Sequence, residues 1–245
     1  MSIMKLSDRD RFGNPVRYRS SVDAGLAPAY GNDSYTKFLL HFDGSSGSTT
    51  MTDSSSHATT FTASGNAAIS TAQSTALGGQ CLYLDGSGDY VSPSDNSLFA
   101  IGTSAFTLDV RAYPLLTTSL RAIVDMRSGD DSNGFVLRIN NGYWTVATGT
   151  STIITGSAAS TSKFTHLAIV GNGGSSGSRT IKLYIDGVLA GTYTTDYNFI
   201  STRVRIGTYW GSSGDYFQGY IDEARLSIGV ERWTAAFTPP SAAYI

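Results

Sequence analysis

The stretch Gly219-Tyr220-Ile221-Asp222-Glu223-Ala224-Arg225-Leu226 decides the fold of this chain. Its aromatic and β-branched residues predict a strand, which carries an adjacent pair of acidic residues. The following segment, 232–240, places an aromatic anchor, Trp233, before the stop Pro239-Pro240. Together the two segments predict the last strand of a β domain, closed by a short irregular piece.

The chain from Lys37 onward shows the same strand-forming composition. Short segments rich in Val, Ile, Tyr, Phe and Thr alternate with clusters of Gly, Ser, Asn and Asp, and helix signals are nearly absent. This pattern is typical of an antiparallel β-sandwich or jelly roll. The predicted strands are 37–42, 58–63, 81–84, 106–113, 121–127, 134–140, 143–148, 163–170, 179–186, 188–194, 203–208 and 216–227.

The clearest local prediction is a hairpin around Asp186-Gly187. Ile181, Leu183 and Ile185 alternate with polar or amphipathic neighbours, as one face of a strand requires. Asp-Gly supplies the positive φ angles of a tight turn. The segment 180–190 is therefore predicted to be two antiparallel strands joined by two residues.

Composition limits the classes of function. At 245 residues, with 40% hydrophobic and 15% charged residues, the chain is predicted to hold one large domain, 36–245. A net charge of −2 argues against nucleic acid as a partner. The single Cys81 excludes a disulfide framework. Neither a signal peptide nor a membrane span is recognisable, which predicts synthesis in the cytoplasm and no membrane insertion.

Residues 1–35 are predicted to be an extended basic arm. They lack a periodic apolar pattern and contain several Pro and Gly residues. Such a segment is either a flexible leader or a docking peptide that becomes ordered on a partner, and the second reading is adopted. The predicted docking residues are Lys5, Arg9, Arg11, Arg17 and Arg19.

Seven segments follow one another in an order that resembles a known family. They are 39–44, 52–55, 82–91, 106–109, 164–168, 183–187 and 221–225. The series resembles laminin-G-like (concanavalin-A-like) jelly rolls, especially those of bacteriophage structural proteins, over about 37–245. One departure is Arg111, which stands where the family has a large aromatic residue. It predicts that this face contacts another chain or a solvated groove.

Asp222 and Glu223 are neighbours in the predicted last strand. Side chains of adjacent strand residues point to opposite faces, so the two are not expected to act as an acid–base pair. One reading is structural: Asp222 accepts hydrogen bonds from buried backbone amides, and Glu223 pairs with Arg225 or Arg203.

The resemblance implies a second reading, a structural calcium ion. In the family an Asp at the position of Asp222 often helps to hold calcium with oxygens of the opening strand and its loop, which here means Asp43 and Asp53. Calcium takes six to eight oxygens, so backbone carbonyls and water would have to complete the site. No other cofactor is expected.

The resemblance also includes glycoside hydrolases, which need two carboxylates facing one sugar. Related endoglucanases carry Glu-x-Asp-x-x-Glu on one strand, whereas this chain has only Glu223 and Glu231. The chain is therefore predicted not to be an enzyme. Two pairs that share strand faces are predicted to be salt bridges instead: Asp109 with Arg111, and Asp125 with Arg127.

The best binding candidate is the aromatic stretch 209–216. Sugar rings stack on aromatic planes while nearby polar groups bond their hydroxyls. A second platform is predicted at 143–144, although both tryptophans would also fit as caps of the sandwich edge. The candidate glycan-binding residues are Tyr209, Trp210, Asp215, Tyr216, Tyr143 and Trp144.

The resemblance suggests a bacteriophage virion protein. The leading hypothesis is a homo-oligomeric tail-fibre or baseplate adhesin that displays a glycan-binding jelly roll and attaches to other virion proteins through its arm. The alternative is a capsid decoration protein that docks on the shell through the same arm. A glycan-cleaving enzyme is the third and least favoured hypothesis.

Overall fold

The structure is a computed structural model, and it describes residues 29–73, 77, 79–129, 133–174, 178–210 and 215–245. In these ranges every regular element is a strand, as predicted. No helix of the described residues has the length and apolarity that a membrane crossing requires. The five predicted docking residues, Lys5, Arg9, Arg11, Arg17 and Arg19, lie outside the described residues.

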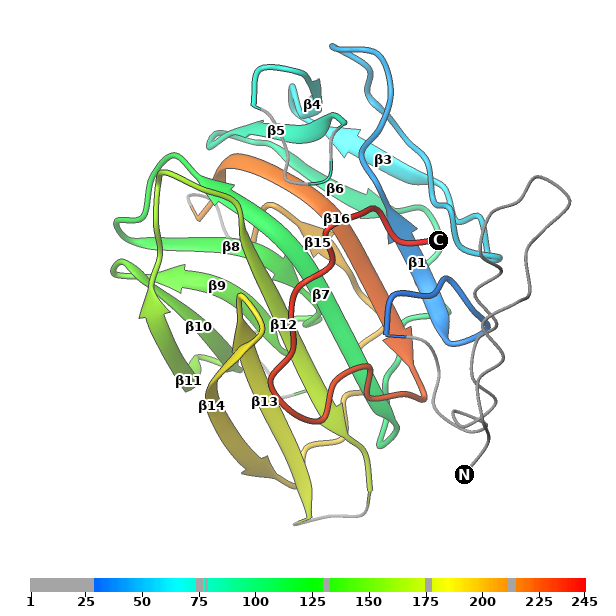
Figure 1. Ribbon diagram of the computed structural model, residues 1–245, viewed down its shortest axis with the longest axis vertical. Coiled ribbons are helices and arrows are strands. Elements are labelled where there is room, and N and C mark those ends of the chain that lie inside the picture. The colour runs from blue at the N-terminus through cyan, green and yellow to red at the C-terminus, as the bar shows by residue number, and fades with distance from the viewer. Residues whose placement is uncertain (1–28, 74–76, 78, 130–132, 175–177, 211–214) are drawn as a thin grey trace, which may run out of the picture.

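Two eight-stranded sheets form the domain (Figure 1). The first sheet has the order β14-β13-β12-β7-β16-β5-β4, and β1 pairs with β16. Its strands are β1 (Thr36–Leu40), β4 (Ala68–Ser70), β5 (Cys81–Asp85), β7 (Ala105–Pro114), β12 (Thr165–Asn172), β13 (Arg179–Ile185), β14 (Val188–Thr195) and β16 (Gln218–Ile228).

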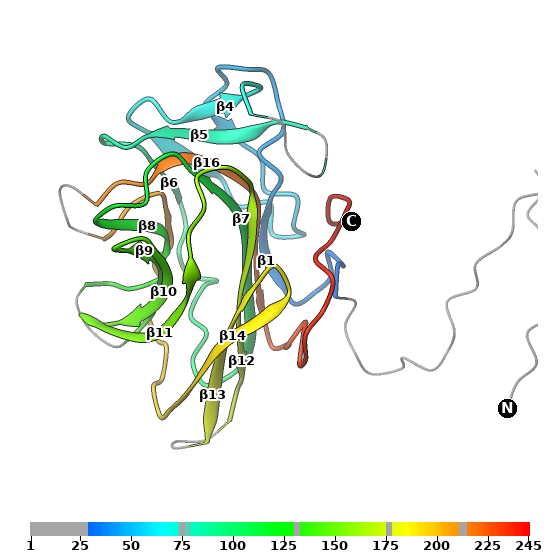
Figure 2. The same cartoon turned by 60° about the vertical axis from the view of Figure 1, so that its left-hand side comes forward.

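The second sheet has the order β11-β10-β9-β8-β15-β6-β3-β2. Its strands are β2 (Thr50–Met51), β3 (Phe61–Ser64), β6 (Tyr90–Pro93), β8 (Leu120–Asp125), β9 (Val136–Asn140), β10 (Tyr143–Thr148), β11 (Ser151–Ala158) and β15 (Arg205–Ile206). Figure 2 shows the two sheets facing each other, and the paired strands are antiparallel. The predicted antiparallel sandwich is confirmed.

Aromatic and aliphatic side chains from both sheets fill the space between them. Phe38 of β1 lies edge-on to Phe61 of β3, with ring centroids 5.4 Å apart. Phe106 of β7 stacks on Phe135 at 5.2 Å, and both are fully buried. Each such ring removes a large apolar area from water, which is the main force that holds the sheets together.

Four strands were not among the predictions: β2, β4, β6 and β11. β2 and β4 contain only two and three residues, too few for a periodic pattern. β11 is an edge strand whose side chains are mostly exposed, so Ser and Thr take the places of core residues there. A weakly buried edge strand has no alternation to detect.

The predicted hairpin is confirmed. β13 and β14 pair antiparallel, and the two turn residues, Asp186 and Gly187, have φ angles of 49° and 77°. Both angles are positive, as a type I′ turn requires. The backbone of Phe237 occupies the place of a Cβ at Gly187, and the Phe237 N–H donates to the Gly187 carbonyl at 3.0 Å.

The chain after β16, residues 229–245, is called the tail, and it forms a third layer outside the first sheet (Figures 1 and 2). Trp233 stacks on Phe237 with centroids 4.1 Å apart and an interplanar angle of 7°. Both rings pack against Tyr184 of β13 and against small side chains of β12. The aromatic anchor predicted from the sequence therefore fastens the tail to the sheet.

The described end of the predicted arm packs beside the tail. The Tyr30 hydroxyl donates to the Thr238 carbonyl at 2.9 Å, and the Asn32 N–H donates to the Ile245 carbonyl at 2.7 Å. Asp33 forms an ion pair with Arg232 at 2.8 Å. Residues 29–33 thus belong to the third layer.

Candidate functional site

An open depression of about 500 Å³ lies on the outer face of the second sheet. We call it the Trp210 groove. β8 and β9, with the segments that follow β8 and β10, form its floor, and the described part of the segment between β15 and β16 forms one wall. Its lining residues are Leu120, Arg127, Ser128, Gly129, Arg138, Gly149, Thr150, Tyr209, Trp210 and Asp215.

Tyr209 lies deep in the groove and is only 6% exposed. Its hydroxyl accepts a hydrogen bond from Arg138 Nη1 at 2.6 Å, and the Arg127 guanidinium lies 4.9 Å from its ring centroid. Burial raises the pKa of Tyr209, so the phenol stays neutral. The residue is a fixed part of the groove floor.

A buried ion pair fixes the entrance to the loop that carries Trp210. Arg127 Nε lies 2.9 Å from Asp125 Oδ1, and both side chains are almost fully buried. The predicted salt bridge is thus confirmed. The second oxygen of Asp125 accepts the Trp210 N–H at 3.0 Å, so the pair also holds the backbone of Trp210.

The indole of Trp210 is partly buried and held by two arginines. The Arg203 and Arg205 guanidinium carbons lie 3.8 Å and 4.0 Å from its ring centroid. Cation–π contacts of this kind restrict the ring and cover part of its face. The platform is therefore less open than the sequence suggested, but it is preorganised.

The other residues of the predicted stretch separate in space. Asp215 lines the groove with Trp210. Tyr216, which is partly buried, does not line it; its carbonyl accepts a hydrogen bond from Arg121 at 3.0 Å. The stretch 211–214 lies outside the described residues.

The second predicted platform is wrong for one of its two members. Trp144 is 1% exposed and points into the core between the sheets, so no ligand can stack on it. Tyr143, its neighbour in β10, points the other way and is 50% exposed. The platform reading treated both aromatics as surface residues, although adjacent strand residues must face opposite sides.

The acidic pair lies at a β-bulge, which overturns the prediction of opposite faces. The register between β16 and β7 shifts between Asp222 and Arg225, and Glu223 has a φ of 47°. An extra residue in a strand disturbs the alternation of side chains. Asp222 and Glu223 are each 3% exposed, and the charge of Glu223 helps to raise the pKa of Asp222.

Glu223 pairs with neither Arg225 nor Arg203. Its Oε1 lies 2.7 Å from His41 Nδ1. The hydrogen bond to Glu223 raises the pKa of His41, which favours the imidazolium form. The partner predicted from sequence was wrong because β1 lies beside β16 at the bulge.

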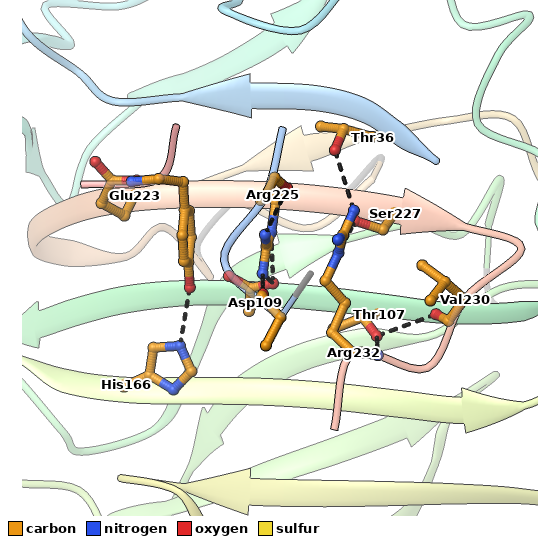
Figure 3. A network of polar contacts seen from close by, with 12 residues as sticks. Thr36, Thr107, Asp109, His166, Glu223, Arg225, Ser227, Val230 and Arg232 are labelled. Atoms are coloured by element: carbon orange, nitrogen blue, oxygen red, sulfur yellow. Dashed lines mark hydrogen bonds and ion pairs between the residues drawn. The ribbon is translucent and has the colours of Figure 1, made fainter. Parts of the chain in front are cut away.

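Arg225 pairs with Asp109, at 3.0 Å, in a fully buried network on the outer face of the first sheet (Figure 3). The predicted pair of Asp109 with Arg111 is therefore wrong. Arg111 donates instead to the Pro240 carbonyl of the tail and is 6% exposed. The tail of the same chain covers Arg111, so the contact with another chain or a solvated groove that the departure from the family pattern predicted at this residue is wrong.

The predicted calcium ligands Asp43, Asp53 and Asp222 do not form one cluster. In the described part of the chain, no group of three or more His, Cys, Asp or Glu side chains is placed to hold a metal. The Asp53 carboxylate accepts the N–H groups of Leu39, Ser55 and Thr59, each at 2.9 Å. Two of these donors lie in the segment that follows Asp53 and the third lies in β1. Calcium binding stays an untested prediction.

Asp222 should make stability depend on pH. Burial, reinforced by Glu223, raises its pKa from 3.8 to about 7. The folded state binds this proton more tightly than the unfolded state, so the stability that it contributes is complete below about pH 4 and is lost as the pH rises to about 7. We expect Asp222→Asn to gain a few kcal/mol over the parent between about pH 5 and pH 8, in urea unfolding. Parallel curves for the two proteins would contradict this.

A comparison with protein-family models agrees with the sandwich fold. Residues 85–230 match the model described as the concanavalin A-like lectin/glucanases superfamily, and the chain belongs to it. A comparison with curated protein sequences gives no match.

Solved structures resemble the fold at low sequence identity. The binding domain of Paraclostridial Mosquitocidal Protein 1 is 14% identical, with a TM-score of 0.61 over 81% of this chain and 50% of that one. Domain 4 of AbnA, a GH43 extracellular arabinanase from Geobacillus stearothermophilus in complex with arabinotriose, is 18% identical, with a TM-score of 0.60 over 80% and 93%. The binding domain of Botulinum Neurotoxin DC in complex with SialylT is 14% identical, with a TM-score of 0.56 over 81% and 48%. The chain thus spans about half the length of the two toxin binding domains.

Proposed function

We propose that this chain is a binding module without catalytic activity, and that it recognises a cell-surface glycan at the Trp210 groove. The observation that carries the proposal is the mixed lining of the groove. An indole and a leucine lie beside hydroxyl, carboxylate and guanidinium groups, among them Ser128, Thr150 and Asp215. Sugars offer both apolar ring faces and hydroxyls, and concave sites of this composition suit them.

The state of Trp210 supports the same proposal. Two guanidinium groups and the hydrogen bond from its backbone N–H hold the residue before any ligand arrives. A ligand that binds a preordered ring does not pay for ordering it. Two of the structural relatives are complexes with arabinotriose and SialylT, which is consistent with a sugar ligand.

The buried carboxylates argue for binding over hydrolysis. Four acidic residues considered in the sequence are at most 3% exposed: Asp109, Asp125, Asp222 and Glu223. Asp109 and Asp125 are held in ion pairs with arginines. A glycosidase needs two carboxylates that reach the same sugar, and these four face protein groups.

The proposed setting is a bacteriophage virion, in which the module is part of a homo-oligomeric tail fibre or baseplate and is attached to other virion proteins by its N-terminal arm. This setting rests on the family resemblance of the sequence. The chain enters the domain at residues 29–33 on the outer face of the first sheet, and the Trp210 groove lies on the outer face of the second. Attachment and recognition would then use opposite faces. Copy number per particle separates a fibre from the alternative, a shell decoration.

A glycan array tests the groove. We expect Trp210→Ala to lose at least about tenfold in affinity for the glycans that the parent binds, because the aromatic contact is removed from the wall of the groove. Tyr35→Ala is the matched control, since Tyr35 is 40% exposed and directly precedes β1 of the first sheet. Unchanged binding by Trp210→Ala would refute the site, and a parent that binds no glycan would refute the function.

A further inference from the structure

Four aromatic residues form a row across the first sheet, which we call the aromatic row: Tyr83, Tyr220, Tyr113 and Phe164. Tyr220 of β16 pairs in register with Tyr83 of β5 on one side and with Tyr113 of β7 on the other. Phe164 directly precedes β12, whose first residue pairs with Ala112 of β7. The ring centroids follow one another at 5.1, 6.1 and 5.5 Å.

The row lies on the outer face of the sheet. The residues next to it along the strands, Leu82, Ala112 and Ile221, are fully buried in the core between the sheets. Alternation therefore turns the row residues outward. All four are partly exposed, whereas the next outward-facing residues along β7 and β16, Arg111 and Asp222, are buried near the tail. The tail thus covers the neighbouring part of this face and leaves the row open to solvent.

We propose that the aromatic row is a second carbohydrate-binding surface, which takes the uncharged chain of a soluble polysaccharide. This goes beyond the function proposed above, because the row and the Trp210 groove lie on opposite outer faces of the sandwich. The row crosses β5, β16 and β7 and ends at the residue before β12, and neighbouring strands of a sheet are about 5 Å apart. It therefore offers rings at similar intervals to an extended polymer. Successive sugars of a chain can then each meet a ring.

The chemistry of the row favours a neutral sugar. Three of its four rings carry a hydroxyl, which can both donate and accept a hydrogen bond. The row itself holds no charged side chain. The flanking Arg111 and Asp222 are buried, and Arg111 is bonded to the tail. An acidic polymer would therefore find no exposed cation within the row.

The tilt of the rings favours a single polysaccharide chain over the surface of a crystalline polysaccharide. Neighbouring rings are inclined at 41°, 81° and 65°, so the row has no flat plane. A crystalline polysaccharide needs a flat platform, because its chains lie in a plane. A separate chain can twist to follow the tilted rings.

Affinity electrophoresis and calorimetry test the proposal with defined probes: soluble arabinan, galactan and mixed-linkage glucan as neutral chains, and polygalacturonate as an acidic one. We expect a neutral polymer to bind the full chain. Tyr113→Ala and Tyr220→Ala should each raise its Kd by about tenfold. Tyr220→Phe, which keeps the ring, should retain most of the affinity and shows whether a loss reflects misfolding. Tyr35→Ala should bind like the parent.

The outcomes separate this site from the Trp210 groove. Loss of polymer binding in the row variants but not in Trp210→Ala supports the aromatic row. Loss in Trp210→Ala alone leaves the proposed function standing and overturns the row. The row is also overturned if no neutral polymer binds the parent. A fourth outcome overturns it as well: the row variants bind normally but convert an oligomer to a monomer, which would make the row a protein interface.

Discussion

Replacing Arg225 with methionine should lower the free energy of unfolding by about 3–5 kcal/mol, because it leaves a buried charge without its partner. Arg225 is fully buried, and two of its nitrogens lie 3.1 and 3.0 Å from Asp109 Oδ2. Its other hydrogen bonds go to the carbonyls of Ala29 and Gly31. One substitution thus unpairs the Asp109 carboxylate (Figure 3) and two backbone oxygens.

The measurement is urea unfolding of Arg225→Met against the parent, with Lys163→Met as the matched control. Lys163 also pairs with an aspartate, Asp186, but is 57% exposed. Exposed pairs contribute at most about 1 kcal/mol, so the control should change little. Adding Asp109→Asn to Arg225→Met should recover part of the loss, because the stranded charge is then removed. A loss below about 1 kcal/mol in Arg225→Met would mean that water reaches the network.

Trp233→Ala should cost a similar amount, about 3–5 kcal/mol, as truncation of a buried tryptophan does. Trp233 is 5% exposed and contacts three parts of the molecule: Phe237 in the tail, His166 in β12 and Tyr30 at the entrance of the chain. Its removal opens a space between the tail and the sheet. The tail should then detach before the sandwich unfolds.

Limited trypsin digestion reads out this detachment separately from global stability. Arg232, 5% exposed in the parent, should become a cleavage site in Trp233→Ala under native conditions. Tyr143→Ala is the control, since Tyr143 is half exposed and lies on the other sheet. If Trp233→Ala unfolds in one step with no early cleavage at Arg232, the tail and the sandwich are a single cooperative unit.

The fold could be predicted from the sequence because most of its strands are buried on at least one face. In β13, for instance, Ile181 and Leu183 alternate with polar residues, and Asp186-Gly187 specifies the turn that follows. Such information is local, since it lies in the spacing of neighbouring residues. β11 has no such alternation because it covers an edge of the sandwich.

The sites could be predicted only in part because they depend on neighbours in space. Within the stretch 209–216, Tyr209, Trp210 and Asp215 do line one groove. The bulge at Glu223 could not be foreseen, because a register shift depends on the partner strand. The aromatic row was missed for the same reason: its rings come from residues 83, 113, 164 and 220. Alternation within β5, β7 and β16 marks the three tyrosines as outward-facing, but only the register aligns them with one another and with Phe164.

The hydrogen bond between Asn32 and Ile245 has a consequence for how this domain can be used as a part. Residues 32 and 245 lie side by side, so the domain can be joined through these two positions to a surface loop of an unrelated host protein without stretching the host. The domain can equally be circularly permuted, with these two positions joined to each other and new termini made at a turn elsewhere. The sandwich can therefore be placed in different host proteins while both of its outer faces stay accessible.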